Sequence, residues 1–388
     1  MDISKTKSIA MLQSNPAPFD ARALQEAHSL AKRGYRVTIL VWDRCQDKTQ
    51  ETPRRRRYSD GVETRTLRLA IPPREPILVV PALFVFYAWC SIQLIVSSFD
   101  VLHCHDFDTL LVGFFAKFVK LKSMKLVLDM HDLPESWLWL FPLTNLMQHW
   151  VLVFTKDLVD LTIVVNERVI SYLGAFGFQR EKMVSVMNVP SLTEGRGHER
   201  SESGFSLVYS GDLSEERGIP LMVDAIAGLS GITLYLTGRG KLERWLCDLE
   251  ERYSNIKFLG WIPNSDLNAL VNKADLIPCL YAPTSLNREF STPGKFFISL
   301  SRSIPALVSS GTYQAQYVEE FGCGIVVKWN DVQELRETVV NLATNAALYA
   351  KLADSAFQAF RSTFNWEVME TRLLGSYVRL LQPSQTNS

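Results

Sequence analysis

Short apolar runs alternate with segments of helical periodicity along almost the whole chain. The clearest helix is 21–33, where apolar residues recur at positions 24, 27, 30 and 31 between Asp20, a suitable N-cap, and Gly34, a C-terminal stop. The first half predicts strands at 8–13, 37–42, 101–104, 125–130 and 161–165, with helices at 21–33, 109–119 and 167–176. The second half predicts strands at 207–210, 233–236, 256–259, 276–280 and 304–308, helices at 219–229, 242–253 and 266–272, and closing helices at 332–343, 347–360 and 366–381.

This alternation predicts an α/β fold built from two doubly wound, Rossmann-like domains, because strands separated by helices form parallel sheets covered on both faces. A chain of 388 residues also suits two cores better than one. The stretch 191–204 is polar, bears glycine and lacks an apolar period, which is typical of a linker. We therefore predict a first domain at 1–190, a linker at 191–204, a second domain at 205–364 and a helix at 365–388 that crosses back to the first domain.

The overall composition excludes several classes of protein. Apolar residues make up 47% and charged residues 21%, as in globular chains, and 41 basic residues balance 41 acidic ones. Because no global positive field results, a general nucleic-acid binder is not expected. The six cysteines are scattered without a C-x-x-C pair, which predicts a reducing compartment and no structural zinc.

The run 76–99 carries no charged residue, so three interpretations of it stay open. It is long enough for a membrane span, although Pro81 interrupts it, and it also suits a helix on the bilayer surface or a buried core helix. The arginines at 54–57 favour an anionic surface nearby, whereas charge runs are more often solvated loops. The apolar N-terminal run 9–12 is too short for a signal peptide. The side chains expected to hold the protein to a membrane are Leu83, Phe84, Phe86 and Tyr87.

Ligands of doubly wound sheets bind at the carboxyl ends of the strands, so the loops that follow the strands carry the candidate site. In the first domain these candidates, assigned to the acceptor, are Asp20, His105, Asp106, His131, Asp132 and Asn188. In the second domain three loops combine glycine or proline, a basic residue and a following helix, and their candidates are Gly211, Arg217, Gly238, Gly240, Thr292, Gly294 and Lys295. A helix N-terminus attracts phosphate, so we expect a phosphorylated donor in the second domain.

Several segments together resemble a known family. They are, in order, DARALQEAHSLAKRGYRVTIL, FDVLHCHDFDTLLVG, LVLDMHDLPE, LVYSGDLSEERGIPLMVDAI, LYLTGRG and STPGKFFISLSRSIPALVSS. In this order and spacing they are similar to the GT-B glycosyltransferases, and most of all to the family 4 group of retaining, nucleotide-sugar-dependent enzymes. The resemblance implies two Rossmann-like domains that face one another across a cleft.

The resemblance also implies roles for individual residues. His131 corresponds to the family histidine beside the transferred sugar, and Arg217 falls where the family has a basic residue on the donor diphosphate. Gly238 and Gly240 would let the backbone approach the nucleotide base, and residues 292–295 would present helix N–H groups to the phosphates.

Two departures from the family pattern concern the donor site. Asp212 follows Gly211 where the family has an arginine. The family pairs two glutamates as E-x7-E, but this chain aligns Phe290 and Ile298 with them, and Glu289 lies one residue from the first. We expect Glu289 to serve if the loop carries an extra residue, and we expect Ile298 to be a buried helix residue.

The resemblance implies a hexosyltransferase-like, retaining, metal-independent enzyme that moves a sugar from a UDP- or GDP-linked donor, without a cofactor. Its expected acceptor is a lipid-linked or polysaccharide glycan, and its expected place is the cytoplasm, peripheral on the inner face of the membrane. A second interpretation is a catalytically weak or inactive partner in a glycan-assembly complex, which Asp212 and Ile298 would explain. A third is another enzyme of the same fold, such as a sugar-nucleotide epimerase, for which we find no dedicated acid/base pair.

Overall fold

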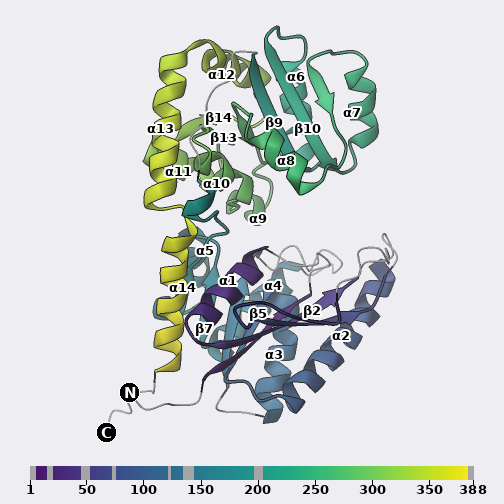
Figure 1. The fold of residues 1–388 in the computed structure, drawn as a ribbon, viewed down its shortest axis with the longest axis vertical. Helices are drawn as coiled ribbons and strands as arrows, with labels where there is room; N and C mark the ends of the chain where they lie inside the picture. The colour runs from purple at the N-terminus through teal and green to yellow at the C-terminus, as the bar shows by residue number, and fades with distance from the viewer. Residues whose placement is uncertain are drawn as a thin grey trace. The chain divides into compact units, whose positions relative to one another are not determined.

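The computed structural model describes residues 6–14, 21–44, 53–71, 76–120, 124–133, 144–195 and 204–382. The chain divides into two compact units (Figure 1). Unit 1 comprises Met1–Val186 and Met369–Ser388, and unit 2 comprises Met187–Val368. The α/β class and the parallel sheets predicted from the sequence are confirmed in both units.

Unit 1 holds one sheet in the order β3-β4-β2-β1-β5-β6-β7-β8, parallel except for the antiparallel pair β3 and β4. Its strands are β1 Ser8–Gln13, β2 Arg36–Asp43, β3 Arg55–Arg57, β4 Glu63–Arg68, β5 Val101–His105, β6 Lys125–Met130, β7 Leu161–Val164 and β8 Met183–Ser185. The sequence patterns did not predict β3, β4 and β8. The arginine run 54–57 was left open between a solvated loop and a basic segment at an anionic surface; residues 55–57 form the exposed edge strand β3.

The helices of unit 1 cover both faces of its sheet. They are α1 Ala21–Lys32, α2 Pro76–Val96, α3 Asp106–Lys120, α4 Thr144–Leu158, α5 Glu167–Gly174 and the Met369 onward part of α14 Trp366–Leu381. Tyr377 of α14 packs against Tyr35 at the end of α1, with ring centroids 6.1 Å apart. α2, α3 and α4 each connect a strand to one nearer the β8 edge of the sheet, whereas α1 connects β1 to β2 in the opposite direction. Because such crossovers are right-handed, α2, α3 and α4 lie together on the opposite face of the sheet from α1.

The buried side of α1 agrees only in part with the predicted one, because Ala27 and Leu30 are buried as expected. The side chains that face the core include Arg22, Ala23, Glu26 and Leu30, whereas Leu24 is only half-buried. Two charged residues, Arg22 and Glu26, therefore lie on the buried side of the helix. They are tolerated there because the sheet beneath supplies Asp129 as a charged partner, which local periodicity does not reveal.

Unit 2 holds two three-stranded parallel sheets, β11-β10-β9 and β12-β13-β14. A bridge between Leu207 and Leu276 joins β9 to the start of β12, so the strand order across both is that of a Rossmann fold. The strands are β9 Phe205–Asp212, β10 Ile232–Arg239, β11 Ile256–Phe258, β12 Ile277–Cys279, β13 Ala306–Ser309 and β14 Gly324–Val327.

The helices of unit 2 are α6 Ile219–Ile226, α7 Glu243–Glu250, α8 Asn264–Val271, α9 Leu286–Glu289, α10 Gly294–Ser301, α11 Tyr313–Phe321, α12 Val332–Thr344 and α13 Ala346–Ser362. They enclose a core of buried aliphatic side chains from β9, β10, α6 and α12. One prediction is corrected here, because residues 287–289 were expected in a polar loop. They form α9, a single turn whose N-terminus is capped when Arg288 N donates to the Ser285 hydroxyl.

Candidate functional site

The carboxyl ends of β9 and β12 lie where the strand order of unit 2 reverses, which is the place where doubly wound folds bind ligands. Gly211 is the last residue but one of β9 and Tyr281 follows β12, while Gly294 opens α10 nearby in the sequence. The Lys295 ammonium reaches back over this point, because a Cβ built on Gly211 would lie 3.6 Å from Lys295 Nζ. The predicted candidates Gly211 and Lys295 are therefore brought together.

Two half-buried cations, Lys295 and Arg217, line this position and rest on aromatic rings. Lys295 Nζ lies 3.7 Å from the centroid of the Tyr209 ring, and Arg217 Cζ lies 4.3 Å from that of Tyr281. No carboxylate within the described ranges forms an ion pair with either cation. Burial, reinforced by Arg217, lowers the pKa of Lys295 to about 8. Two like charges held together without an ion-paired carboxylate, with Asp212 acting on Lys295 only from beyond ion-pair distance, make a site that attracts an anion.

Three glycines hold the ends of β9 and β10 close together. Gly238 has φ +136°, and a Cβ there would lie 1.9 Å from the Gly211 carbonyl oxygen. A Cβ at Gly240 would lie 2.3 Å from the Leu213 carbonyl oxygen. Glycine is therefore required at both predicted positions by the protein's own backbone, before any ligand is considered.

Gly294 is the first residue of α10 and Thr292 lies two residues before it, and both are half-buried. Asn188 lies against this helix start, since a Cβ on Gly294 would be 3.9 Å from its side-chain nitrogen. Asn188 was predicted in the first domain, but it belongs to unit 2, because the division falls at residue 186. It is thus placed beside the predicted phosphate-binding turn rather than among the acceptor residues.

Ile298 corrects a second expectation. It was expected to be buried, yet 37% of its surface is exposed, whereas Phe297 and Ser299 beside it are fully buried. Ile298 follows Lys295 by one helical turn and so shares its face of α10. An apolar side chain therefore stands on the free face of α10, at the position aligned with the second family glutamate.

Glu289 ends α9 and is half-buried, and Phe290, aligned with the first family glutamate, is buried. Asp212 is exposed and its carboxylate accepts the Ser214 hydroxyl at 2.6 Å. Asp212 thus holds the loop that follows β9. The positive charge beside Gly211 comes from Lys295, not from residue 212, where the family has an arginine.

In unit 1 the strand order reverses between β1 and β5, and three predicted residues meet at this edge. His131 Nε2 lies 3.2 Å from His105 Nδ1, and the His131 backbone N–H donates to Asp106 Oδ1 at 2.9 Å. Asp106 has φ +63°, a conformation that aspartate tolerates better than most residues. Asp132 is exposed beside His131, and Asp20 lies outside the described residues.

A buried charged cluster lies beneath His131. Asp129 Oδ2 is 3.3 Å from His131 Nε2, and Asp129 Oδ1 accepts from Arg22 at 2.5 Å, while Arg22 Nε also donates to Glu26 at 3.0 Å. Burial opposes the charged form of His131, but Asp129 outweighs it and holds the pKa of His131 well above its ordinary value. Burial and the charge of Asp129 raise the pKa of Glu26 to about 8. Asp129 and Asp106 therefore set the position of His131, and Asp129 favours its charged form.

Within the described part of the chain, Glu26, His103, His105 and Asp129 form a group that could hold a metal ion, with ligand atoms within 4.8 Å of one another. Arg22 already contacts both carboxyl groups, so a metal ion would meet a guanidinium at close range. His103 Nδ1 is engaged with the Tyr377 hydroxyl at 2.8 Å. These contacts fit a proton-sharing network better than a metal centre.

Sequence reasoning missed four residues of these sites. Tyr209 and Tyr281 lie within or directly after strands, and their aromatic rings gave no signal of a role beneath cations. Asp129 sits inside an apolar strand and Arg22 inside a helix. For Arg22 the available signal was its spacing of four residues from Glu26, on a helix in which alanines lie next to both residues.

Two family models match the chain. The first, described as a glycosyl transferase 4-like domain, matches residues 20–188. The second, described as glycosyl transferases group 1, matches residues 204–345. Together they account for well over half of the chain. A comparison with curated proteins finds no match.

Solved structures share this fold at low identity. Sucrose-phosphate synthase from Thermosynechococcus elongatus is 16% identical with a TM-score of 0.79, over 96% of this chain and 99% of that one. HepE of Anabaena, in complex with UDP and glucose, is 16% identical with a TM-score of 0.70, over 95% and 99%. WaaG, a glycosyltransferase involved in lipopolysaccharide biosynthesis, is 15% identical with a TM-score of 0.65, over 94% and 98%.

Proposed function

We propose that this chain, which belongs to the GT-B glycosyltransferases, transfers a sugar from a nucleoside diphosphate to a lipid-linked or polysaccharide acceptor. The proposed transfer retains the anomeric configuration of the sugar and needs no metal ion. The family models bear out the resemblance read from the sequence. The observation that carries the proposal is the pair of cations Arg217 and Lys295, which have no carboxylate partner in the described ranges and lie beside the N-terminus of α10.

A leaving diphosphate needs positive charge in the transition state, and fixed cations can supply it where a metal ion does not. An arginine can bind two phosphate oxygens at once, and an ammonium adds a point charge, so the two side chains suit the two phosphates of one donor. This supports metal independence. We propose a UDP- or GDP-linked donor; HepE was solved with UDP and glucose.

We propose that His131 orients the transferred sugar. A protonated imidazole held by Asp129, on a backbone whose N–H is bound by Asp106, can donate a hydrogen bond to a sugar hydroxyl. The retaining outcome rests on the family resemblance: the acceptor attacks the face that the diphosphate leaves, the bond from the anomeric carbon to the phosphate oxygen breaks, and the departing phosphate takes the acceptor proton.

A second candidate function is a weak or inactive partner in a glycan-assembly complex. The exposed Ile298 favours it, because an isoleucine cannot hydrogen-bond the ribose hydroxyls that a glutamate would hold. Asp212 favours it as well, because its carboxylate brings negative charge to the end of β9.

The test is to incubate the protein with UDP-, GDP- and dTDP-sugars and to measure slow donor hydrolysis and thermal shift, with and without a chelator. We expect one nucleotide to raise the melting temperature and its sugar to be released with unchanged anomeric configuration. Arg217→Gln should abolish both responses, and Arg252→Gln, an exposed arginine of the same unit, should leave them intact. If no donor binds, or hydrolysis inverts the anomeric carbon, the proposal fails; co-purification of another transferase would then favour the second function.

A further inference from the structure

Three adjacent helices of unit 1 present apolar side chains to solvent on one face of its sheet. α2 and α3 lie side by side in Figure 1, and Lys117 of α3 donates to the Leu158 carbonyl of α4 at 2.6 Å. Of the nineteen exposed large hydrophobic residues in the described part of the chain, thirteen lie on these three helices. We call this surface the apolar face, and its most exposed side chains are Leu111, Phe84, Phe118, Phe154, Ile92 and Val96.

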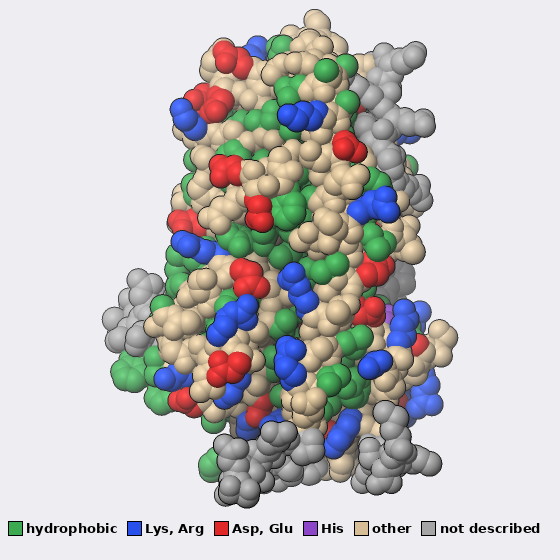
Figure 2. All heavy atoms as spheres, turned by 90° about the vertical axis from the view of Figure 1, so that its left-hand side faces the viewer, with side chains coloured by type: hydrophobic (Ala, Val, Ile, Leu, Met, Phe, Trp, Pro, Cys, Tyr) green, Lys and Arg blue, Asp and Glu red, His purple; other side chains and the backbone are tan. Residues whose placement is uncertain are grey.

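The exposure on the apolar face is large enough to need a partner. Phe118 is 92% exposed and Val96 79% exposed. Soluble proteins tolerate scattered apolar residues, but a contiguous patch of this kind marks an interaction surface. By contrast, Figure 2 looks at the face with α13 and α14, where basic and acidic side chains are interspersed.

α2 lies along the sheet, with one side buried and the other side apolar. Ala82, Phe86, Cys90 and Leu94 are buried at four-residue spacing, and Phe86 stacks on Trp42 with ring centroids 5.7 Å apart. The segment Leu78–Val96 has a mean hydropathy of 2.1 and is long and apolar enough to cross a membrane. Only 22% of it is buried within the protein, so most of this apolar helix is not covered by the core. Because its other side is held by the sheet, this helix is suited to lie in a bilayer surface and not to cross it.

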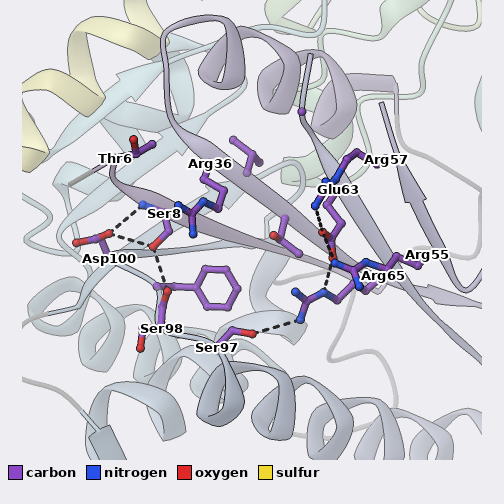
Figure 3. A pocket seen from close by; sticks show the side chains of 14 residues that line it. Thr6, Ser8, Arg36, Arg55, Arg57, Glu63, Arg65, Ser97, Ser98 and Asp100 are labelled. Carbon is purple, nitrogen blue, oxygen red and sulfur yellow. Dashed lines mark hydrogen bonds and ion pairs between the residues drawn. The ribbon is translucent and has the colours of Figure 1, made fainter. Parts of the chain in front are cut away.

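An arginine cluster stands at the C-terminal end of α2 (Figure 3). Arg65 donates to Ser97 at 3.3 Å and to Gln93 at 3.0 Å, so the cluster is attached to the helix. Arg55, Arg57 and Arg65 all share one carboxylate, Glu63.

Three cations on one anion leave a net positive charge, and the side chains of Arg55 and Arg57 are 65% and 71% exposed. These arginines and Arg36 line a cavity of about 620 Å³. Two more arginines are exposed here, Arg54 just before β3 and Arg56 within it.

We propose that the apolar face docks on an anionic lipid bilayer, with α2 in the plane of the membrane and the arginine cluster against headgroup phosphates. The apolar side chains enter the boundary between headgroups and acyl chains, where an in-plane helix with a bulky apolar side binds. The arginines supply the charge complementarity that selects an anionic membrane over an apolar protein surface. Each contributes about fivefold to partitioning, from about 1 kcal/mol per basic residue at such a surface.

The test uses the full chain and co-sedimentation with vesicles of phosphatidylcholine alone or mixed with phosphatidylglycerol. We expect the wild type to sediment with the mixed vesicles. The variant Phe84→Ser/Phe118→Ser/Phe154→Ser should weaken this binding at least about tenfold, since each side chain loses its share of apolar burial. Trp261→Ser, which removes an exposed aromatic residue of unit 2, should bind as the wild type does.

A second variant, Arg55→Gln/Arg57→Gln, should bind the mixed vesicles less tightly, by about fivefold for each arginine. Circular dichroism and thermal melting of each variant show that it is folded, and the proposal does not depend on donor binding. A wild type that stays in the supernatant with both vesicles overturns the proposal. So does a vesicle-free dimer that the triple serine variant dissociates, because a second copy would then be the occupant. Equal binding to neutral and mixed vesicles would overturn the role of the arginines.

Discussion

Lys295→Met should make the ligand-free protein more stable at pH 7 while it weakens donor binding. Lys295 is a half-buried cation without a carboxylate partner in the described ranges, and burial lowers its pKa from 10.5 to about 8. A charge kept at neutral pH in such a place costs free energy of folding, because the unfolded chain solvates it better. Methionine has a similar length and carries no charge.

The magnitude follows from the two pKa values. At about 1.36 kcal/mol per pKa unit, the difference between 10.5 and about 8 corresponds to at most about 3 kcal/mol. Partial exposure reduces this, and methionine also loses the cation–π contact with Tyr209, worth about 0.5–1 kcal/mol. We expect the free energy of unfolding at pH 7 to rise by about 1 kcal/mol. Loss of a charged phosphate contact, worth about 1.5–3 kcal/mol, should weaken UDP binding by about tenfold or more.

The assay is urea denaturation between pH 7 and pH 10, with and without UDP. Between pH 8 and 10.5 the unfolded wild type binds more protons at Lys295 than the folded protein does, so this residue makes stability rise with pH. The methionine variant should lack that rise. UDP affinity of the wild type should fall as pH passes about 8, and Lys295→Arg should abolish the fall, because arginine stays protonated.

Lys273→Met is the matched control, since Lys273 is exposed in the same unit. It should change neither stability nor UDP binding. The reasoning is refuted if Lys295→Met destabilises the ligand-free protein at pH 7, or if it binds UDP as tightly as the wild type.

Three further predictions concern other parts of the molecule. Asp129→Asn should lower the pKa of His131 toward or below its ordinary value, measured by NMR titration, and should destabilise the fold by about 3–5 kcal/mol because it removes the buried negative charge that faces both Arg22 and His131; an unchanged histidine pKa would contradict the assigned contact. Gly238→Ala should reduce the melting temperature and solubility sharply, because the new methyl group would meet the Gly211 carbonyl at 1.9 Å, and a normal melting curve would show that the two strand ends can separate. Phe86→Ala should cost about 3–5 kcal/mol of unfolding free energy in denaturant titrations, and a cost below 1 kcal/mol would mean that α2 is not packed on the sheet.

The sequence by itself determined most of the elements, the α/β class and the family, but not the short strands β3, β4 and β8. The features that it determined depend on local periodicity and on ordered motifs, which one strand or helix expresses without its neighbours. It also identified Arg217, Lys295, His105 and His131, because chemistry at the carboxyl end of a strand is visible as polar residues after an apolar run.

Only the tertiary structure decided which side of each helix is buried and which charges pair. Arg22 and Asp129 are 107 residues apart in the chain, and their contact exists only because the sheet order places β6 beneath α1. The same packing buries Phe86, which was expected to face a membrane, and leaves Phe84 exposed beside it. In an almost wholly apolar helix the composition is the same all round, so the sheet underneath, and not the sequence pattern, selects the buried side.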